Sequence, residues 1–324
     1  MERTTTLQRA DALWLLRRLR LIRQASERIA KLYPSNVMAT PVHLCIGQEA
    51  VPVGVCRHLR DTDKLFLGHR THGPALAKGL PLPKLFAELY GRTTGCSHGF
   101  GGSMHVLDLE HGLPGSSAIV GGSIALGVGA GLASKLVGGD WLGVSWFGDA
   151  ATNAGVFHES LNFAALRRLP VLFVCEDNGL SNVMPKAQHS ATDIVSLARQ
   201  FMPTLAADGT DVLSVYERAG EAIARIRAGE GPMFLHCPTK RWMKHQGHEP
   251  CDLAAATLDR ERDCPIHKLE KFLCRSGLAT RAELAEIAAD VESEVDAAVR
   301  FAEQSPFPPP GLLEACRALE PPRP

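Results

Sequence analysis

The hydrophobic pattern between residues 142 and 182 predicts a strand, a helix and a second strand. Residues 142–147 form a short apolar run that ends in Gly148-Asp149, and residues 171–175 form a continuous apolar run, as in strands buried on both faces. Between them, residues 153–168 carry apolar side chains at helical spacing until Leu169-Pro170 ends the pattern. A right-handed crossover then places both strands in one parallel sheet.

Polar residues follow both predicted strands. Because ligands bind beyond the carboxyl ends of parallel strands, we expect Asp149 and Asn178 to be neighbours in space. A carboxylate and an amide oxygen are hard ligands that suit Mg²⁺ or Ca²⁺. The helix expected to begin near Asn153 would direct backbone N–H groups to the same place, which suits a phosphate. The segment therefore predicts a seat for a magnesium-bound diphosphate.

The rest of the chain continues the alternation of helices and strands. We predict an α/β fold, a doubly wound and mostly parallel sheet with helices on both faces. The expected organisation is an N-terminal helical extension (1–39), an α/β domain (40–307) and a proline-rich tail (308–324). Expected helices cover residues 7–32, 194–202, 212–228, 262–273 and 279–302, the last capped by Thr280, and expected strands cover 204–207 and 232–237.

Residues 116–136 are small and apolar and predict a loop that runs into a tightly packed helix. Small residues there would permit close approach by another helix: Gly127, Gly129, Ala130, Gly131 and Ala133.

Composition excludes several classes of function. The 35 basic and 35 acidic residues give a formal net charge of zero, which argues against a partner that is nucleic acid or a membrane surface. No apolar run is long enough to span a bilayer, and the N-terminus lacks the apolar core of a signal peptide. The nine cysteines form no CxxC pair, so we expect no structural zinc and a reducing, cytoplasmic location.

Four further motifs carry candidate chemistry. His43 precedes Gly47-Gln48-Glu49-Ala50, and the run from His69 to Gly73 contains Arg70, whose planar donor fork suits phosphate oxygens. The glycine-rich stretch 90–105 ends in Gly-Gly-Ser-Met-His and predicts a loop with unusual backbone angles. Residues 239–252 combine Arg241-Trp242 with Gly247-His248.

Together these motifs resemble a known family. The segment from Gly148 to Asn178 resembles the thiamine-diphosphate motif, which begins Gly-Asp-Gly and closes with Asn-Asn after the next strand. Residues 7–307 resemble the alpha subunit of the first component of 2-oxo acid dehydrogenase complexes of the pyruvate, acetoin and branched-chain types. The sequence departs from the family pattern at three of its motif positions, with Ala150 for the second Gly, Asp177 for the first Asn and His69 for Tyr. Glu249 occupies the position of a regulatory serine, so we expect no kinase control there.

The resemblance implies roles for individual residues. It makes Asp149, Asn178 and the backbone carbonyl of Leu180 the metal ligands. It makes His43, His72 and His248 the candidate catalytic residues, with His245 as a second choice to His248. The implied cofactor-binding residues are His69, Arg70, Ala118, Val120, Gly148, Asp149, Ala150, Ala151, Asn153, Asn178 and Leu180.

The resemblance also implies a reaction and partners. Thiamine diphosphate with Mg²⁺ would serve as the electron sink for decarboxylation of a small 2-oxo acid. The family shares its active site with a beta subunit, which implies an α2β2 heterotetramer and, as a further partner, a lipoyl acyltransferase. Three alternatives stay open: half of a split transketolase, a non-oxidative carboligase or decarboxylase, and a catalytically silent scaffold subunit.

Overall fold

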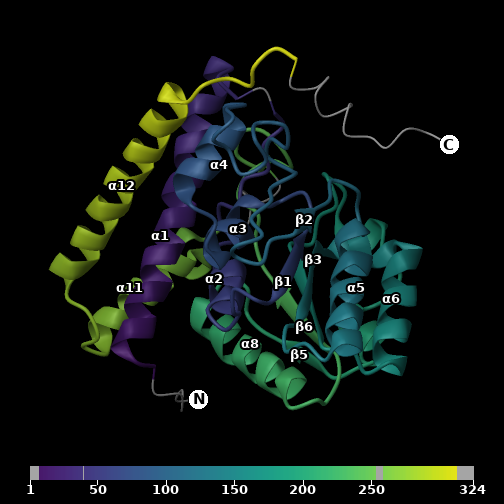
Figure 1. Cartoon of the computed structure of the whole chain (residues 1–324). Helices are drawn as coiled ribbons and strands as arrows, with labels where there is room; N and C mark the ends of the chain where they lie inside the picture. Colours follow the sequence, from purple (N-terminus) through teal and green to yellow (C-terminus); the bar gives the residue numbers. More distant parts are fainter. Residues whose placement is uncertain (1–6, 39, 253–257, 312–324) are drawn as a thin grey trace.

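A computed structural model describes residues 7–38, 40–252 and 258–311 (Figure 1). Its described strands form one six-stranded sheet in the order β2-β1-β3-β4-β6-β5, and every neighbouring pair is parallel. This confirms the predicted α/β class. The strands are β1 (Lys64–Leu67), β2 (Gly115–Ser116), β3 (Gly143–Gly148), β4 (Val171–Asp177), β5 (Thr204–Ala206) and β6 (Met233–Pro238).

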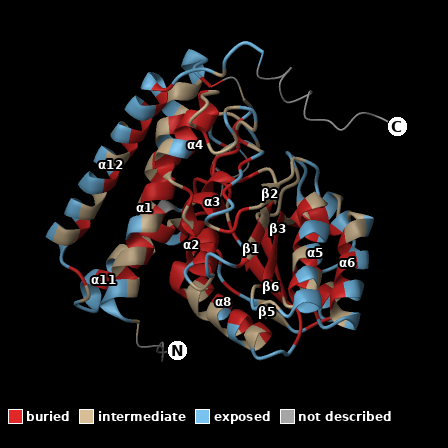
Figure 2. Cartoon of the chain, viewed as in Figure 1, coloured by how far each residue is buried: buried red, intermediate tan, exposed pale blue. Residues whose placement is uncertain are grey.

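Helices cover both faces of the sheet. Along β4, Leu172 and Val174 belong to the apolar core that includes α2 and α8, whereas Phe173 belongs to a second core with α5 and α6. Every residue of β4 is buried, as its unbroken apolar run predicted, and its neighbours β3 and β6 are buried except at their last residue (Figure 2). The two alternating faces of each strand thus fix one layer of helices on each side of the sheet.

The described helices follow the sequence pattern closely. Among the α-helices are α1 (Arg9–Leu32), α2 (Ala50–Cys56), α3 (His72–Lys78), α4 (Leu82–Leu89), α5 (Gly122–Val137), α6 (Gly155–Leu166), α7 (Ile194–Ala198), α8 (Val212–Arg227), α10 (Arg260–Asp263), α11 (Pro265–Arg275) and α12 (Arg281–Gln304). Three short 3-10 helices are η1 (Tyr33–Ser35), η2 (Asp149–Asn153) and η3 (Lys186–Gln188). The helix expected to begin near Asn153 begins at Gly155 instead, because η2 occupies the first turn after β3.

The N-terminal helix packs on the body of the molecule. Helix α1 runs beside α12 and also contacts α3 and α11 (Figure 1). Leu15, Leu16 and Leu19 are fully buried in the same core as one face of the sheet. Thr280 caps α12 as the sequence predicted, and its side chain accepts from the Glu283 N–H as part of a capping box. Residues 1–6 and 39 of the predicted extension and 312–324 of the predicted tail lie outside the described residues.

The small residues of α5 divide between two faces. A Cβ on Gly127 would lie 2.2 Å from Ser145 Oγ, and one on Gly131 would lie 2.4 Å from Val171 Cγ2, so both glycines let α5 approach the sheet of its own chain. This corrects the expectation that all these small residues serve an approach by another helix. Gly129 and Ala133 are exposed and remain on the outer face.

Within the described part of the chain, no helix is both long and apolar enough to cross a membrane.

Candidate active site

A pocket of about 740 Å³ lies at the carboxyl edge of the sheet. Loops after β1, β2, β3, β4 and β6 contribute to it, which is the place expected for a ligand of a parallel sheet. Nine predicted site residues line it: His69, Arg70, Val120, Gly148, Asp149, Ala150, Ala151, Asn178 and Leu180. Ala118, Asn153, His43, His72 and His248 are not among its lining residues.

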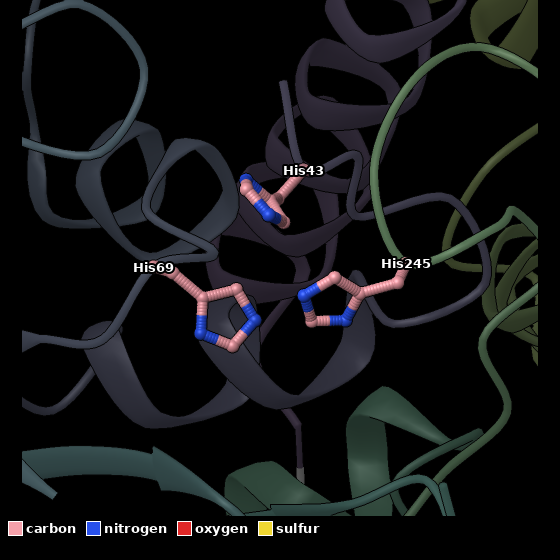
Figure 3. A group of neighbouring side chains, drawn as sticks. All are labelled: His43, His69 and His245. Atoms are coloured by element: carbon pink, nitrogen blue, oxygen red, sulfur yellow. The ribbon is translucent and has the colours of Figure 1, made fainter. Parts of the chain in front are cut away.

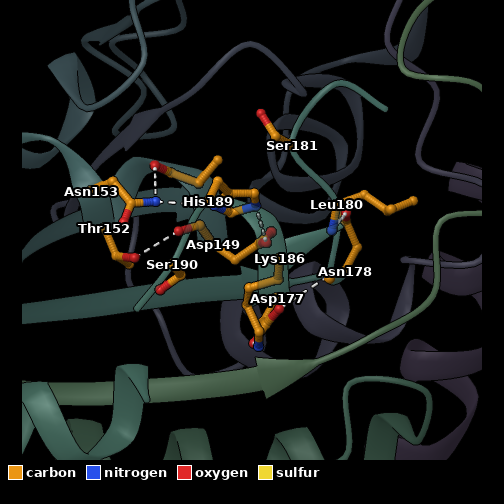
Figure 4. A network of polar contacts seen from close by, with 12 residues as sticks. Asp149, Thr152, Asn153, Asp177, Asn178, Leu180, Ser181, Lys186, His189 and Ser190 are labelled. Atoms are coloured by element: carbon orange, nitrogen blue, oxygen red, sulfur yellow. Dashed lines mark hydrogen bonds and ion pairs between the residues drawn. The ribbon is translucent and has the colours of Figure 1, made fainter. Parts of the chain in front are cut away.

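Asp149 and Asn178 come together as their positions at adjacent strand ends predicted. The ladder pairs Gly148 with Glu176, so the residues that follow β3 and β4 share one corner of the pocket (Figure 4). Asp149 is 1 % exposed, and no described group donates a hydrogen bond to its Oδ2. Burial, with a smaller contribution from Asp177, raises the pKa of Asp149 to about 7. A buried carboxylate oxygen without a donor is suited to a cation, so the residues present fit Mg²⁺.

Asn178 lies beside Asp149. Its Oδ1 accepts the Leu180 N–H at 3.2 Å, which folds the chain so that Leu180 also lines the pocket. The carboxylate of Asp149 and the amide oxygen of Asn178 thus share one corner with Leu180, and oxygen ligands of this kind are those that Mg²⁺ binds.

Asp177, the departure from the family pattern, has its charge compensated. The Lys186 ammonium forms an ion pair with Asp177 Oδ2, and His236 Nε2 lies 2.8 Å from the same oxygen. Burial alone would raise the pKa of Asp177, but the hydrogen bonds from His236 and Lys186 lower it. The carboxylate is thus held inside the loop rather than left to repel a phosphate.

Ala150 is accommodated by η2. Among the described non-glycine residues, a positive φ occurs only at Asn36, His98 and Arg168, so Ala150 has an ordinary backbone conformation. A glycine is not required at this position, and the added methyl group lies on the pocket wall without backbone strain.

Asn153 turns from the pocket toward the neighbouring loop. Its Nδ2 lies 3.1 Å from His189 Nδ1, and His189 Nε2 lies 3.9 Å from Asp149 Oδ2. Asn153 therefore supports the loop beside Asp149.

Two guanidinium groups give the pocket a cationic wall. Arg70, 8 % exposed, donates to the Leu44 carbonyl, and burial lowers its pKa to about 10, so it stays charged at neutral pH. Arg241 donates to the carbonyls of Ser181 and Asn182 at 3.3 and 2.7 Å, which holds the loop after Leu180. Such a wall facing Asp149 across the pocket suits a metal-bound diphosphate.

Three histidine rings lie beside this wall. The ring centroids of His43 and His69 are 4.8 Å apart, and each lies 5.0 Å from the centroid of His245 (Figure 3). His69 and His245 line the pocket, while His43 is buried behind them. Burial, added to by neighbouring cations, lowers their pKa values to about 2 for His43, 3 for His69 and 4 for His245, so all three rings are neutral near pH 7.

The other two catalytic candidates lie elsewhere. His72 is buried at the start of α3, with Nε2 2.9 Å from Ser103 Oγ. The His248 ring packs 5.8 Å from the Tyr33 ring, because the 244–249 segment turns back on itself through a bond from Lys244 N–H to the Glu249 carbonyl. His245, the second choice, is the histidine of this loop that reaches the pocket.

The loop before α5 forms the mouth of the pocket. Val120 is 58 % exposed and Ile119 is 77 % exposed, and both line the opening. Ala118 lies between lining residues on the same loop. The family resemblance implies that backbone groups of Ala118 and Val120 hold the pyrimidine ring of the cofactor, and this role stays a prediction.

Sequence reasoning did not select Glu176 and Arg241, which also line the pocket. Glu176 accepts the Trp146 Nε1–H at 2.9 Å, and burial raises its pKa to about 7. In the sequence, Glu176 could have been recognised as an acidic residue that directly follows an apolar strand pattern. The signal for Arg241 was its place in the loop that follows a buried strand, three residues after the end of β6.

Fold and pocket together are typical of an α/β protein with a site suited to a metal-associated phosphate at the carboxyl edge of a parallel sheet. The sequence matches the family described as dehydrogenase E1 component over residues 17–311, and the chain belongs to this family, as an alpha subunit. It is an oxidoreductase component, and the family uses thiamine diphosphate and Mg²⁺, which confirms the predicted enzyme class and cofactors. Family membership favours the first component of a dehydrogenase complex over a split transketolase.

Three relatives illustrate the match. Over 94 % of this chain and 92 % of the relative, it is 39 % identical to the alpha subunit of acetoin:2,6-dichlorophenolindophenol oxidoreductase of Bacillus subtilis. Over 94 % of this chain and 79 % of the relative, it is 36 % identical to the human mitochondrial pyruvate dehydrogenase E1 alpha subunit, somatic form. It is also 36 % identical to the Zymomonas mobilis pyruvate dehydrogenase E1 alpha subunit, over 93 % of this chain and 86 % of the relative.

Proposed function

We propose that this chain is the diphosphate-binding half of an active site that it shares with a beta subunit. The observation that carries the proposal is the buried Asp149 Oδ2, which has no described donor and shares its corner of the pocket with Asn178. Asp149, Asn178 and the Leu180 carbonyl would hold Mg²⁺, and Arg70, His69 and His245 would bind the diphosphate oxygens. Gly148 and the backbone N–H groups of Ala150 and Ala151 would receive the same group at the start of η2.

The bound cofactor supplies an electron sink for cleavage next to the carbonyl group of the substrate. The chain's own residues orient it and exclude water. Buried Arg70 and Arg241 line the pocket and hold neighbouring loops by donating to backbone carbonyls. We assign His245 to the pocket wall, where its neutral ring can donate a hydrogen bond to the bound group, and buried His43 to a positioning role behind it.

A beta subunit would supply the carboxylate that activates the pyrimidine ring of the cofactor, because Glu49, the carboxylate that a motif of this chain offers, is already engaged. Glu49, a candidate from its motif, is fully buried and pairs with Arg23 at 2.5 Å, and it also accepts the Gly47 N–H. A partner would also cover apolar side chains on α5, α6 and the pocket mouth: Ile119, Leu126, Leu136 and Leu166. We propose an α2β2 heterotetramer, with a lipoyl acyltransferase as acceptor, and a cytoplasmic location.

Calorimetry on the complex of this chain with its beta subunit tests the site. Asp149→Ala should abolish Mg²⁺-dependent binding of thiamine diphosphate, whereas Asp140→Ala, which changes an exposed carboxylate, should leave it intact. Unchanged affinity in Asp149→Ala would refute the metal-site assignment. A silent scaffold would show no binding even in the unsubstituted complex.

A turnover assay tests the shared site and the substrate. Expressed alone, the chain should be inactive, and co-expression with the beta subunit should restore reduction of 2,6-dichlorophenolindophenol by pyruvate or by acetoin. Comparing the two substrates decides between the pyruvate and acetoin types of relative. A condensed product without dye reduction would favour a carboligase. Robust turnover by the single chain would overturn the half-site proposal and direct attention to Glu176.

A further inference from the structure

His43, His69 and His245 converge from three separate segments of the chain. His43 precedes α2, His69 follows β1, and His245 follows β6. Each offers one ring nitrogen such that the three atoms lie within 4.8 Å of one another (Figure 3). No described group hydrogen-bonds to the buried Nδ1 atoms of His43 and His245. Three imidazoles whose ring nitrogens converge in this way are the arrangement of a metal site with an open fourth position.

We propose that these three histidines form a second metal site, selective for Zn²⁺ and similar borderline ions and separate from the magnesium site at Asp149. An all-imidazole set without a carboxylate suits Zn²⁺, Co²⁺ or Ni²⁺ and is poor for Mg²⁺. The rings are neutral near pH 7, so their lone pairs are available without loss of a proton.

The geometry needs only a small adjustment. Zn²⁺ binds imidazole nitrogen at about 2.1 Å, so each ring would move by about 1 Å toward the centre of the triangle. His69 and His245 are partly exposed in the pocket wall and can rotate, while buried His43 supplies the fixed ligand. The pocket provides the entry path and room for a water molecule as fourth ligand.

The neighbouring charges make the site selective. Arg70 lies close enough to lower the pKa of each ring, and its guanidinium donates to backbone carbonyls rather than to a carboxylate. The positive charge of Arg70 disfavours a cation that would be bound by electrostatic attraction alone. An ion that gains more from nitrogen coordination is therefore required.

Occupation of the site would compete with the cofactor. This part rests on the proposed function, in which His69 and His245 face the diphosphate. A ring nitrogen that coordinates Zn²⁺ has no proton to donate to a phosphate oxygen. Zn²⁺ should therefore weaken thiamine-diphosphate binding in the complex. Excess Mg²⁺ should not displace the bound Zn²⁺.

Metal titration of the full chain, without thiamine diphosphate and with excess Mg²⁺, tests the site directly. We expect one Zn²⁺ per chain by calorimetry, and Co²⁺ should give the visible absorption of a tetrahedral nitrogen site. His69→Tyr and His245→Gln should each weaken Zn²⁺ binding by about 100-fold or more and remove the Co²⁺ bands. His248→Ala is the matched control, because that ring lies on the same loop but packs on Tyr33.

Thermal unfolding should verify that each variant is folded. Zn²⁺ binding that is absent from the unsubstituted chain, or that survives in folded His69→Tyr and His245→Gln, would overturn the proposal. An equal loss in His248→Ala would do the same. If Zn²⁺ binds but does not compete with thiamine diphosphate, the metal site is supported and only its overlap with the diphosphate site is rejected.

Discussion

His236 on β6 and Asp177 at the end of β4 meet across two neighbouring strands, with Nε2 2.8 Å from Oδ2. The same carboxylate receives the Gly179 N–H at 3.1 Å and the Lys186 ammonium. Asp177 therefore ties the loop that follows Asn178 to the sheet. The acidic departure from the family pattern is part of a built network, and its removal has consequences that can be measured.

Lys186→Met should weaken binding of the cofactor and lower stability. Without the ammonium, the buried Asp177 charge lies beside the phosphate seat and loses a charged partner, at a cost of about 1–3 kcal/mol. Calorimetry with magnesium and thiamine diphosphate, together with urea unfolding, measures both effects. The double variant Asp177→Asn/Lys186→Met removes the charge as well and should recover most of the affinity. A double variant no better than Lys186→Met would show that charge compensation is not the role of Lys186.

Gly47→Ala should disrupt the wall that carries His245. Gly47 has φ +91°, and its Cβ would lie 2.2 Å from Trp242 Cδ1, so the indole beneath Arg23 must move. We expect a loss in unfolding free energy larger than the about 1–2 kcal/mol of a positive φ alone. Gly229→Ala measures that backbone contribution separately, since Gly229 has φ +82° and no described atom within 4 Å of its Cβ. Equal losses in the two variants would exclude the steric contact as a cause.

Glu88→Gln should loosen the glycine-rich loop. The Glu88 carboxylate, 1 % exposed, accepts four backbone N–H groups, from Ser97, Gly99, Gly101 and Gly102, at 2.7 to 3.0 Å. An amide has one acceptor oxygen and turns two donors toward these N–H groups, so the cost is on the order of 3 kcal/mol. Hydrogen exchange at these four amides should accelerate, and Glu110→Gln, an exposed change nearby, should leave it unaltered. Unchanged protection would contradict the role of Glu88.

His72 should make the fold sensitive to acid. Burial, with a contribution from Arg70, lowers its pKa from 6.5 to about 4, so the unfolded chain binds a proton below about pH 6.5 and the folded chain does not. Stability is therefore lost as pH falls from about 6.5 to about 4. Between pH 7 and pH 5.5 this residue alone removes about 1.3 kcal/mol. Urea unfolding of His72→Gln should show that the change in unfolding free energy between these pH values is smaller by that amount. The variant His105→Gln, at an exposed position, should show no such reduction.

The main elements of the fold followed from local pattern. Burial determines which residues of β4 and α1 are apolar. The continuous apolar run of β4 and the amphipathic pattern of α1 could therefore be read directly from the sequence. The meeting of Asp149 with Asn178 followed from the geometry of parallel strands. These predictions needed no knowledge of distant contacts.

Other features depended on contacts that no local pattern encodes. His245 rather than His248 reaches the pocket because the loop turns at Lys244 and Glu249 and because the Gly247 N–H donates to the distant Val42 carbonyl. The compensation of Asp177 required a lysine nine positions later and a histidine on another strand. Likewise, α6 begins at Gly155 because η2 occupies Asp149–Asn153, and apolar spacing does not distinguish these two kinds of helical turn.

The division of α5 into two faces separates two kinds of selective pressure on one helix. Gly127 and Gly131 touch the sheet, so replacement there would force the helix away from β3 and β4 and harm the whole fold. Leu126, Gly129 and Ala133 face outward and can change without disturbing those strands. Substitutions on the outer face of α5 should therefore allow related proteins to change their partner subunit. The residues on the inner face should stay the same.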